Sequence, residues 1–305
     1  MTISSTNSVV FLMGPTASGK TELALEMYNQ LDASLISVDS ALIYRGMDIG
    51  TAKPSKVTLE NYPHALIDIC EPDESFSVNQ FVSLAKQHIE SALNAGKLPI
   101  LVGGTSFYFN ALEHGLSKLP ESTKDSRKYF NDRLKNQGSE KLHSQLLKID
   151  PTSATRIHPN DSQRVTRALE VFHLSGVTLS ELQGNKNENK LNHEIKKIIL
   201  MPDRSELHQR IEQRFIEMIK DGFLDEVETL RKNKNLNLDL ASMRCVGYRQ
   251  AWNYFDGLYS KQEMIEKAII ATRQLCKRQS TWLRNESNAL ILKETNIDKA
   301  INFLQ

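Results

Sequence analysis

A glycine-containing stretch near the N-terminus, FLMGPTASGKTELAL (residues 11–25), has the residue types needed to hold phosphate. Its spacing matches G-x-x-x-x-G-K-[ST], the P-loop pattern, in which backbone N–H groups surround an anion and a helix N-terminus adds a positive dipole. Gly14 and Gly19 are expected to supply positive φ angles, and Lys20 a charge for the phosphate oxygens. We therefore predict a phosphate cradle formed by Gly14, Pro15, Thr16, Ala17, Ser18, Gly19, Lys20 and Thr21, with the Thr21 hydroxyl as a Mg²⁺ ligand.

Residue types alone do not fix which groups act beside this cradle. P-loop NTPases normally add an acidic Mg²⁺ ligand at the end of another strand. The apolar run that ends in VGGT offers only Thr105, whereas SLISVD (34–39) ends in Asp39. Asp39 fits three roles, a Mg²⁺ ligand, a general base or a helix N-cap, and Thr105 fits either a ligand site or a cap. The reaction therefore stays open at this point.

Composition narrows the class of protein. The chain has 305 residues, 40% hydrophobic and 25% charged, with a formal net charge of +1. This near-neutral balance means that any nucleic-acid surface must be local. The three cysteines form no C-x-x-C pair, which argues against a disulfide framework or structural zinc and favours reduced thiols. No apolar run reaches membrane length, and the N-terminus lacks the basic region of a signal peptide, so we expect a cytoplasmic protein.

Short apolar runs alternate with helical patterns, which is typical of a parallel sheet covered by helices on both faces. We predict an α/β fold of the P-loop NTPase type, with a core of residues 1–114 and 196–305 and an all-helical insertion over 115–195. The tract GNKNENKLNHE (184–194) is expected to be a flexible connector. The predicted strands are 9–13, 34–39, 65–69, 99–104 and 195–201, and the main predicted helices are 21–31, 78–96, 204–232 and 261–284.

Three later segments carry basic side chains that could contact RNA. The first, NDSQRVTRALEVFHLSG (160–176), reads as a helix capped by Asn160 or Asp161 and ended by Gly176. The second, RCVGYR (244–249), combines arginine and tyrosine, whose planar groups stack on splayed bases, although a turn between two helices explains it equally well. The third is a basic stripe formed by Arg273, Lys277 and Arg284 on the helix 261–284, which suits a contact with the phosphate backbone, although a generic solvated face is the alternative.

Together these stretches closely resemble the bacterial tRNA dimethylallyltransferase family. The resemblance rests on the P-loop, SVDSALIYRGMDIGTAKP (37–54), LVGGTSFY (101–108), RIHPNDSQRVTRALEVF (156–172), SMRCVGYRQAW (242–252) and ATRQLCKRQSTWLR (271–284). It runs in order from about residue 8 to residue 285. The family transfers a prenyl group from dimethylallyl diphosphate to the exocyclic amine of the adenosine 3′ of the anticodon.

The resemblance implies roles that residue types alone do not fix. The P-loop would hold a diphosphate leaving group with Mg²⁺, and Lys20, Asp39 and Thr105 would be catalytic, Asp39 as general base. The partner would be a tRNA anticodon stem-loop. Independently of the resemblance, Arg210 and Arg214 lie one turn apart on the predicted helix 204–232, and we expect them to reach the diphosphate. The implied tRNA contacts are Asp39, Ser40, Ala41, Leu42, Thr105, Arg127, Gln163, Arg164, Val165, Thr166, Arg167, Arg244, Cys245, Val246, Gly247, Tyr248, Arg249, Lys277, Arg278 and Arg284.

Two other functions compete with this interpretation. A small-molecule or nucleotide kinase would use the P-loop for ATP and Asp39 for Mg²⁺, and would transfer the γ-phosphate. A non-catalytic RNA-binding NTPase switch would bind RNA in an ATP- or GTP-dependent manner without changing it covalently. The sequence shows no coiled-coil seam of the kind that would indicate an oligomer, so we expect a monomer.

Overall fold

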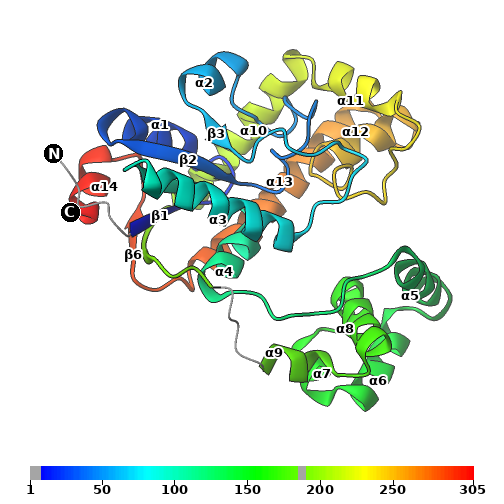
Figure 1. Ribbon diagram of the computed structural model, residues 1–305. Helices are drawn as coiled ribbons and strands as arrows, with labels where there is room; N and C mark the ends of the chain where they lie inside the picture. Colours follow the sequence, from blue (N-terminus) through cyan, green and yellow to red (C-terminus); the bar gives the residue numbers. More distant parts are fainter. Residues whose placement is uncertain (1–7, 185–189) are drawn as a thin grey trace. The chain divides into compact units, whose positions relative to one another are not determined.

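The computed structural model describes residues 8–184 and 190–305 and contains a six-stranded parallel sheet (Figure 1). The strand order is β3-β2-β4-β1-β5-β6, and every neighbouring pair is parallel. The strands are β1 (Ser8–Met13), β2 (Ala33–Val38), β3 (His64–Ala65), β4 (Leu98–Gly103), β5 (Glu194–Leu200) and β6 (Ala289–Leu292). The parallel α/β class expected from the alternating pattern is confirmed.

Helices cover both faces of the sheet, which explains why its central strands are continuous apolar runs. Val10 and Leu12 of β1 face one side and pack with α1 (Lys20–Gln30) and α14 (Ile297–Leu304). Phe11 points to the other face, where its ring lies 4.9 Å from that of Phe109 in α4 (Ser106–His114). The helix α3 (Val78–Asn94) also packs on β2 and β4, and it begins with a capping box formed by Ser77 and Gln80.

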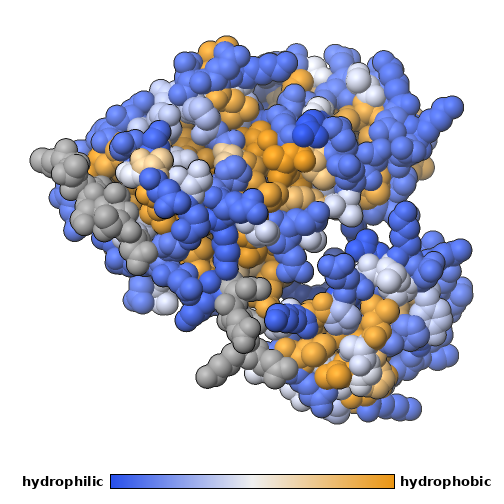
Figure 2. Space-filling model, viewed as in Figure 1, coloured by the Kyte–Doolittle hydropathy of each residue, from blue (hydrophilic) through white to orange (hydrophobic). Residues whose placement is uncertain are grey.

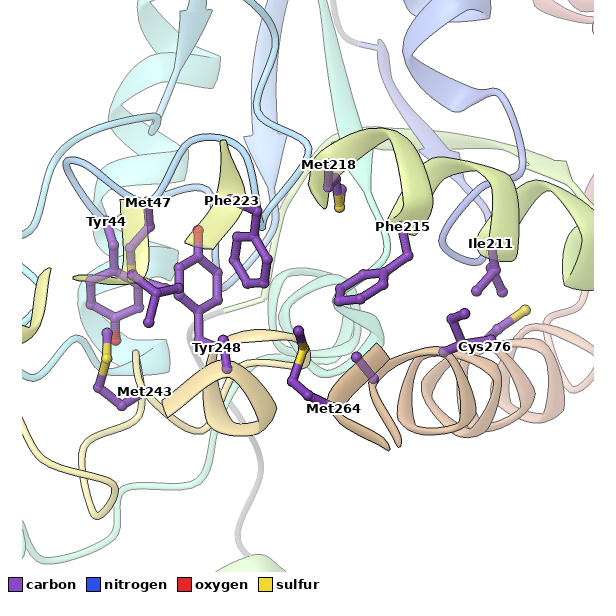
Figure 3. Close-up of a cluster of buried hydrophobic side chains, with 14 of the residues drawn as sticks. Tyr44, Met47, Ile211, Phe215, Met218, Phe223, Met243, Tyr248, Met264 and Cys276 are labelled. Atoms are coloured by element: carbon purple, nitrogen blue, oxygen red, sulfur yellow. The ribbon is translucent and has the colours of Figure 1, made fainter. Parts of the chain in front are cut away.

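A second apolar core lies beside the sheet, between the C-terminal helices and the loop that follows β2. Figure 3 shows Tyr44 and Met47 from that loop facing Phe223 and Tyr248. Phe223 stands edge-on to Tyr248 at a centroid distance of 5.2 Å. This core is built from α10 (Arg204–Lys220), α11 (Phe223–Arg231), α12 (Tyr248–Phe255) and α13 (Lys261–Leu283).

The chain divides into two compact units, one running to Glu113 and resuming at Leu191, and the other comprising His114–Lys190. The described part of the second unit is helical and has its own core, which includes Phe130, Leu142, Leu146 and Val165. Its helices are α5 (Lys124–Gln137), α6 (Ser139–Ile149), α7 (Pro151–Arg156), α8 (Ser162–Ser175) and α9 (Leu179–Gly184). Within the predicted connector, residues 185–189 lie outside the described residues.

The helix expected over 160–176 is present as α8. Asp161, not Asn160, caps it: the Arg164 N–H donates to the Asp161 carboxylate at 3.1 Å. Gly176 ends the helix in the left-handed region with φ 70°. Among the described residues, no helix combines the length and the apolar character needed to cross a membrane.

Two predicted elements differ from the structure, and one pair of elements was not predicted. The strand predicted over 65–69 is confined to His64–Ala65, because Leu66 and Asp68 adopt positive φ and the Asp68 carboxylate turns to bind Lys53. The helix predicted over 204–232 is two helices separated at Asp221–Gly222, where Gly222 takes φ 97°. The final β6–α14 pair was not predicted, because the run ALIL is too short to signal a strand alone.

The loop after β2 is held by one carboxylate from α11. The Glu226 side chain accepts N–H bonds from Asp48 (2.8 Å), Ile49 (2.7 Å) and Gly50 (3.2 Å). It also accepts the Tyr248 hydroxyl at 2.6 Å. Burial and the Glu226 charge raise the pKa of Tyr248, so this phenol stays a donor. One side chain thus ties the loop that begins at Asp39 to both α11 and α12.

We predict that Glu226→Gln lowers the free energy of unfolding by about 2–3 kcal/mol. In the wild type both carboxylate oxygens accept hydrogen bonds, whereas in the variant an amide nitrogen, itself a donor, would take the place of one of these charged acceptors. Urea denaturation would measure the loss. Glu228→Gln, an exposed position on the same helix, is the matched control and should change little. Equal stability of the two variants would contradict the assigned role of Glu226.

Candidate functional site

The P-loop connects β1 to α1 and has the left-handed backbone that an anion cradle requires. Gly19, immediately before α1, has φ 94°, and Ala17 has φ 64°. Gly14 does not adopt positive φ, contrary to expectation; its lack of a side chain serves close packing, since a Cβ there would lie 2.6 Å from the Leu200 carbonyl oxygen. The Ser18 side chain is buried, and its hydroxyl has no hydrogen-bond partner among the described residues. The loop is therefore a turn that carries a buried hydroxyl left over for a ligand.

Lys20 lies at the first position of α1 and folds back over the loop. Its ammonium donates to the Pro15 carbonyl oxygen at 2.8 Å. Burial lowers the pKa of Lys20 to about 8, while the charge of Asp39 opposes this shift and that of Arg214 adds to it. An anion in the cradle would replace the lost hydration of this ammonium.

Two arginines from α10 approach the same loop. Arg214 donates to the Thr16 hydroxyl at 2.5 Å, and Arg210 donates to the Ser18 carbonyl oxygen at 3.4 Å. Burial lowers the pKa of Arg214, and the Asp39 charge opposes that shift. The sequence expectation that these side chains approach the phosphate site is consistent with this placement, because guanidinium groups suit phosphate oxygens.

Asp39 and Thr105 follow the ends of β2 and β4, which are neighbouring strands. The Thr105 hydroxyl accepts the Ser40 N–H at 3.0 Å, and the Thr105 N–H donates to the Val38 carbonyl oxygen at 3.2 Å. The Asp39 Oδ1 accepts the Ala41 N–H at 2.8 Å. The described residues supply no hydrogen bond to Oδ2, so that oxygen can accept one from a ligand.

Electrostatics place Asp39 among the same groups. Its charge acts on Lys20 and Arg214, as described, and adds to the burial that raises the pKa of Tyr108 to about 12. The phosphate cradle and the carboxylate therefore share one site, at the carboxyl edge of the sheet where ligands of open α/β folds bind.

The described residues contain no cluster of three or more acidic, histidine or cysteine side chains able to hold a metal ion. The P-loop and the Asp39 carboxylate nevertheless fit Mg²⁺, because that ion usually keeps several waters and binds through one or two protein oxygens plus substrate phosphates. The exposed Thr21 hydroxyl at the start of α1 and the Asp39 carboxylate provide oxygen atoms of the type that Mg²⁺ prefers.

Most of the residues expected to contact RNA are accessible. Arg127 lies on α5, which buries only Ser126 and Phe130 and is largely hydrophilic in Figure 2. Ser40 is exposed beside Asp39, while Ala41, Leu42, Cys245 and Val246 are half-buried. The other exposed residues of this set are Gln163, Arg164, Arg244, Arg249, Lys277, Arg278 and Arg284.

Other members of that set have structural roles for their side chains. Tyr248 is fully buried and bonded to Glu226, so its ring is not a stacking surface, and Gly247 packs beside the Phe223 ring. Val165 belongs to the core of the helical unit. The Thr166 hydroxyl donates to the Ser162 carbonyl oxygen at 2.7 Å.

Arg167 is also committed to the helical unit. Its guanidinium donates to the Glu170 carboxylate (2.7 Å), the Ser122 hydroxyl (2.7 Å) and the Pro120 carbonyl oxygen (2.6 Å). Glu170 is buried and also accepts the Ser126 hydroxyl at 2.5 Å. In the basic stripe, Arg273 likewise pairs with Glu212 at 2.6 Å. Sequence could not separate these paired arginines from the exposed ones, because both occupy polar helix positions.

Gln279 on α13 is the site residue that sequence reasoning did not single out. Its amide contacts both the P-loop and the Gly104 carbonyl oxygen. It stands between Arg278 and Ser280 in a polar run, and only the tertiary packing of α13 against the loop distinguishes it.

The fold and the site together define a P-loop protein of the α/β class, in which the phosphate loop lies beside one carboxylate and one threonine. Comparison with known proteins makes the assignment more specific. A family model described as IPP transferase matches residues 42–286. The tRNA dimethylallyltransferases of Ruthia magnifica subsp. Calyptogena magnifica and Vesicomyosocius okutanii subsp. Calyptogena okutanii (strain HA) are 61% and 60% identical over 304 residues, which is 100% of this chain and 99% of each relative.

Solved structures agree with these relatives. The full-length tRNA isopentenylpyrophosphate transferase from Bacillus halodurans is 36% identical with a TM-score of 0.70, covering 97% of this chain and 93% of that one. A eukaryotic dimethylallyltransferase acting on tRNA is 26% identical with a TM-score of 0.75, covering 91% and 70%. The chain belongs to the IPP transferase family.

Lys20 gives a pH prediction for anion binding. Below its pKa of about 8, the Lys20 ammonium is charged and attracts an anion, whereas above that pKa the charge is lost. A bound anion raises the pKa of Lys20, so in the complex the charge is lost at a higher pH. We expect the affinity advantage of the wild type over Lys20→Met for inorganic pyrophosphate to shrink as pH rises from about 7 to about 9.5. Calorimetric titration would measure it, and the ratio cancels the titration of pyrophosphate itself. A ratio independent of pH would contradict the prediction.

Proposed function

We propose that this protein transfers a dimethylallyl group from dimethylallyl diphosphate to the exocyclic amine of the adenosine 3′ of the anticodon in tRNA, releasing diphosphate. The observation that carries the proposal is the placement of a phosphate cradle after β1 and a carboxylate after β2, the two strands that flank β4, at the same edge of the sheet. Membership of the IPP transferase family and the names of the close relatives support this reaction and not the alternative of a kinase.

At the donor end, the protein stabilises the charge that builds on the departing diphosphate. The N–H groups of the loop, the Lys20 ammonium and the Arg214 guanidinium would bind its oxygens, the usual dominant contribution when charge develops on a leaving group. Mg²⁺, held with the Thr21 hydroxyl and the diphosphate itself, would neutralise further negative charge. ATP, which also carries a diphosphate, is expected to compete for the same loop.

At the acceptor end, the amine nitrogen attacks the first carbon of the prenyl chain as the carbon–oxygen bond to diphosphate breaks. An aryl amine is a poor nucleophile, so loss of its proton must accompany bond formation. Asp39 is the proposed general base, and the free Oδ2 would accept that proton. Thr105, fixed by its bond with the Ser40 N–H, would lie beside the acceptor nucleotide.

The adenosine would have to leave its stack to reach Asp39, as bases that undergo chemistry generally do. Recognition of an anticodon stem-loop would then depend on its shape and on unstacked bases. The proposed tRNA contacts include exposed basic side chains from several elements: Arg127 of α5, Arg164 of α8, Lys277 and Arg278 of α13, Arg284 at the C-terminal end of α13, Arg244 and Arg249. We propose that the enzyme works as a monomer in the cytoplasm, with residues 115–195 as a domain that contacts tRNA.

The role of Asp39 predicts a specific loss of rate. Asp39→Asn should lower kcat by about 10²–10⁴-fold, because the amide cannot accept the amine proton. The test is the mass of nucleosides from tRNA incubated with Mg²⁺, dimethylallyl diphosphate and enzyme, followed over time. Asp32→Asn, at the opposite end of the same strand and highly exposed, is the control. Retained activity in Asp39→Asn would remove the general base from the proposal.

The proposed RNA face predicts a salt effect. Replacing both Arg278 and Arg284 with alanine should reduce the magnitude of the slope of log affinity against log salt by about 1–2. Each phosphate contact that is lost means that tRNA binding releases about one counterion fewer. Filter binding of tRNA across a salt series would measure it. Lys293→Ala, a highly exposed lysine outside α13, should leave the slope unchanged. An unchanged slope in the double variant would place the RNA elsewhere.

A further inference from the structure

Gln279 bridges two parts of the site that lie far apart in the sequence. The Thr16 N–H of the P-loop donates to the Gln279 Oε1 at 2.9 Å, and the Gln279 Nε2 donates to the Gly104 carbonyl oxygen at 2.9 Å. One amide group on α13 therefore contacts the loop after β1 and the turn after β4 simultaneously.

The two bonds match the two ends of a neutral amide. A backbone N–H must meet an acceptor and a backbone carbonyl must meet a donor, and the oxygen and nitrogen of a planar amide offer both side by side. Glutamate would lack the donor, and lysine would lack the acceptor. The orientation of the Gln279 amide is thus set by its partners.

The turn after β4 is shaped to admit this side chain. A Cβ at residue 104 would lie 2.6 Å from the Gln279 Nε2, so any residue larger than glycine would displace the amide. Gly104 therefore serves the close approach of α13, and it directly precedes Thr105.

From Gly104 the connection continues to the proposed base. Thr105 bonds to Ser40 and to the Val38 carbonyl oxygen, the two residues that flank Asp39. On the other side, Thr16 is held through its hydroxyl by Arg214. The diphosphate loop and the acceptor side are therefore linked through Gln279 by hydrogen bonds together with the peptide linkage between Gly104 and Thr105.

We propose that Gln279 is a positioning residue that fixes the diphosphate loop relative to Thr105 and Asp39, and so aligns the donor carbon with the acceptor amine. This inference rests on the proposed function. Gln279 acts through Thr16 and Gly104, so it sets geometry and not chemistry. Misalignment by about 1 Å can lower a rate about 10²-fold while substrates still bind.

The expected signature is a loss confined to turnover. Gln279→Ala should lower kcat about 10–100-fold. The KM for dimethylallyl diphosphate and the affinity for inorganic pyrophosphate should change less than about 3-fold, because Lys20 and Arg214 remain. Gln279→Glu keeps the acceptor for Thr16 but loses the donor to Gly104, so it should also lose turnover despite its matching shape.

The experiment measures kcat and KM for prenylation of tRNA by the full-length protein, together with pyrophosphate affinity and the thermal midpoint of each variant. Gln274→Ala, an exposed glutamine on the same helix, is the matched control and should behave as the wild type. The thermal midpoints should agree among the variants.

Three outcomes would overturn the inference. They are wild-type kcat in Gln279→Ala, wild-type kcat in Gln279→Glu, and a fall in pyrophosphate affinity as large as the fall in kcat, which would mean that Gln279 only maintains the loop. Failure of the wild type to prenylate tRNA would refute the proposed function itself, and is thus distinguishable.

Discussion

The structure depends on one geometric constraint, which is that parallel strands end at the same edge of their sheet. The central order β2-β4-β1 places the chain segments after these three strands side by side, at the ordinary spacing of about 5 Å between strands. The P-loop follows β1, Thr105 follows β4 and Asp39 follows β2. The strand order alone thereby brings a phosphate cradle and a carboxylate to one site, whatever conformations the loops adopt.

The C-terminal helices then make this edge specific. Arg214 from α10 and Gln279 from α13 both contact Thr16, one at its hydroxyl and the other at its backbone N–H. Glu226 from α11 holds the loop after β2 through three backbone N–H groups. The loops of the sheet edge are therefore ordered not by the sheet alone but also by polar side chains from the helices packed beside it.

Much of this could be predicted from sequence. The P-loop and the parallel sheet have strong local signals, because glycine spacing and buried apolar runs report backbone shape directly. The roles of Asp39 and Thr105 could not be chosen from residue types, since an acid or a hydroxyl at a strand end serves several purposes. Resemblance to a family supplied the choice.

What sequence missed depends on tertiary contacts. Tyr248 and Arg167 have the residue types of RNA contacts, yet one is buried against Glu226 and the other is paired with Glu170. Gln279 has no sequence signal, since its importance comes from the two backbone groups that α13 meets. The sequence predicted one helix over 204–232 because the spacing of apolar residues continues from α10 into α11, and it therefore gave no sign of the break at Gly222.

The central claim is that the P-loop holds a leaving diphosphate and not a transferred phosphate. The most direct measurement is the stoichiometry of one reaction containing tRNA, Mg²⁺, dimethylallyl diphosphate and γ-labelled ATP. The account predicts one diphosphate released for each adenosine that gains five carbons, with no label in the RNA or in any other product. Transfer of the γ-phosphate without a gain of mass on adenosine would contradict it.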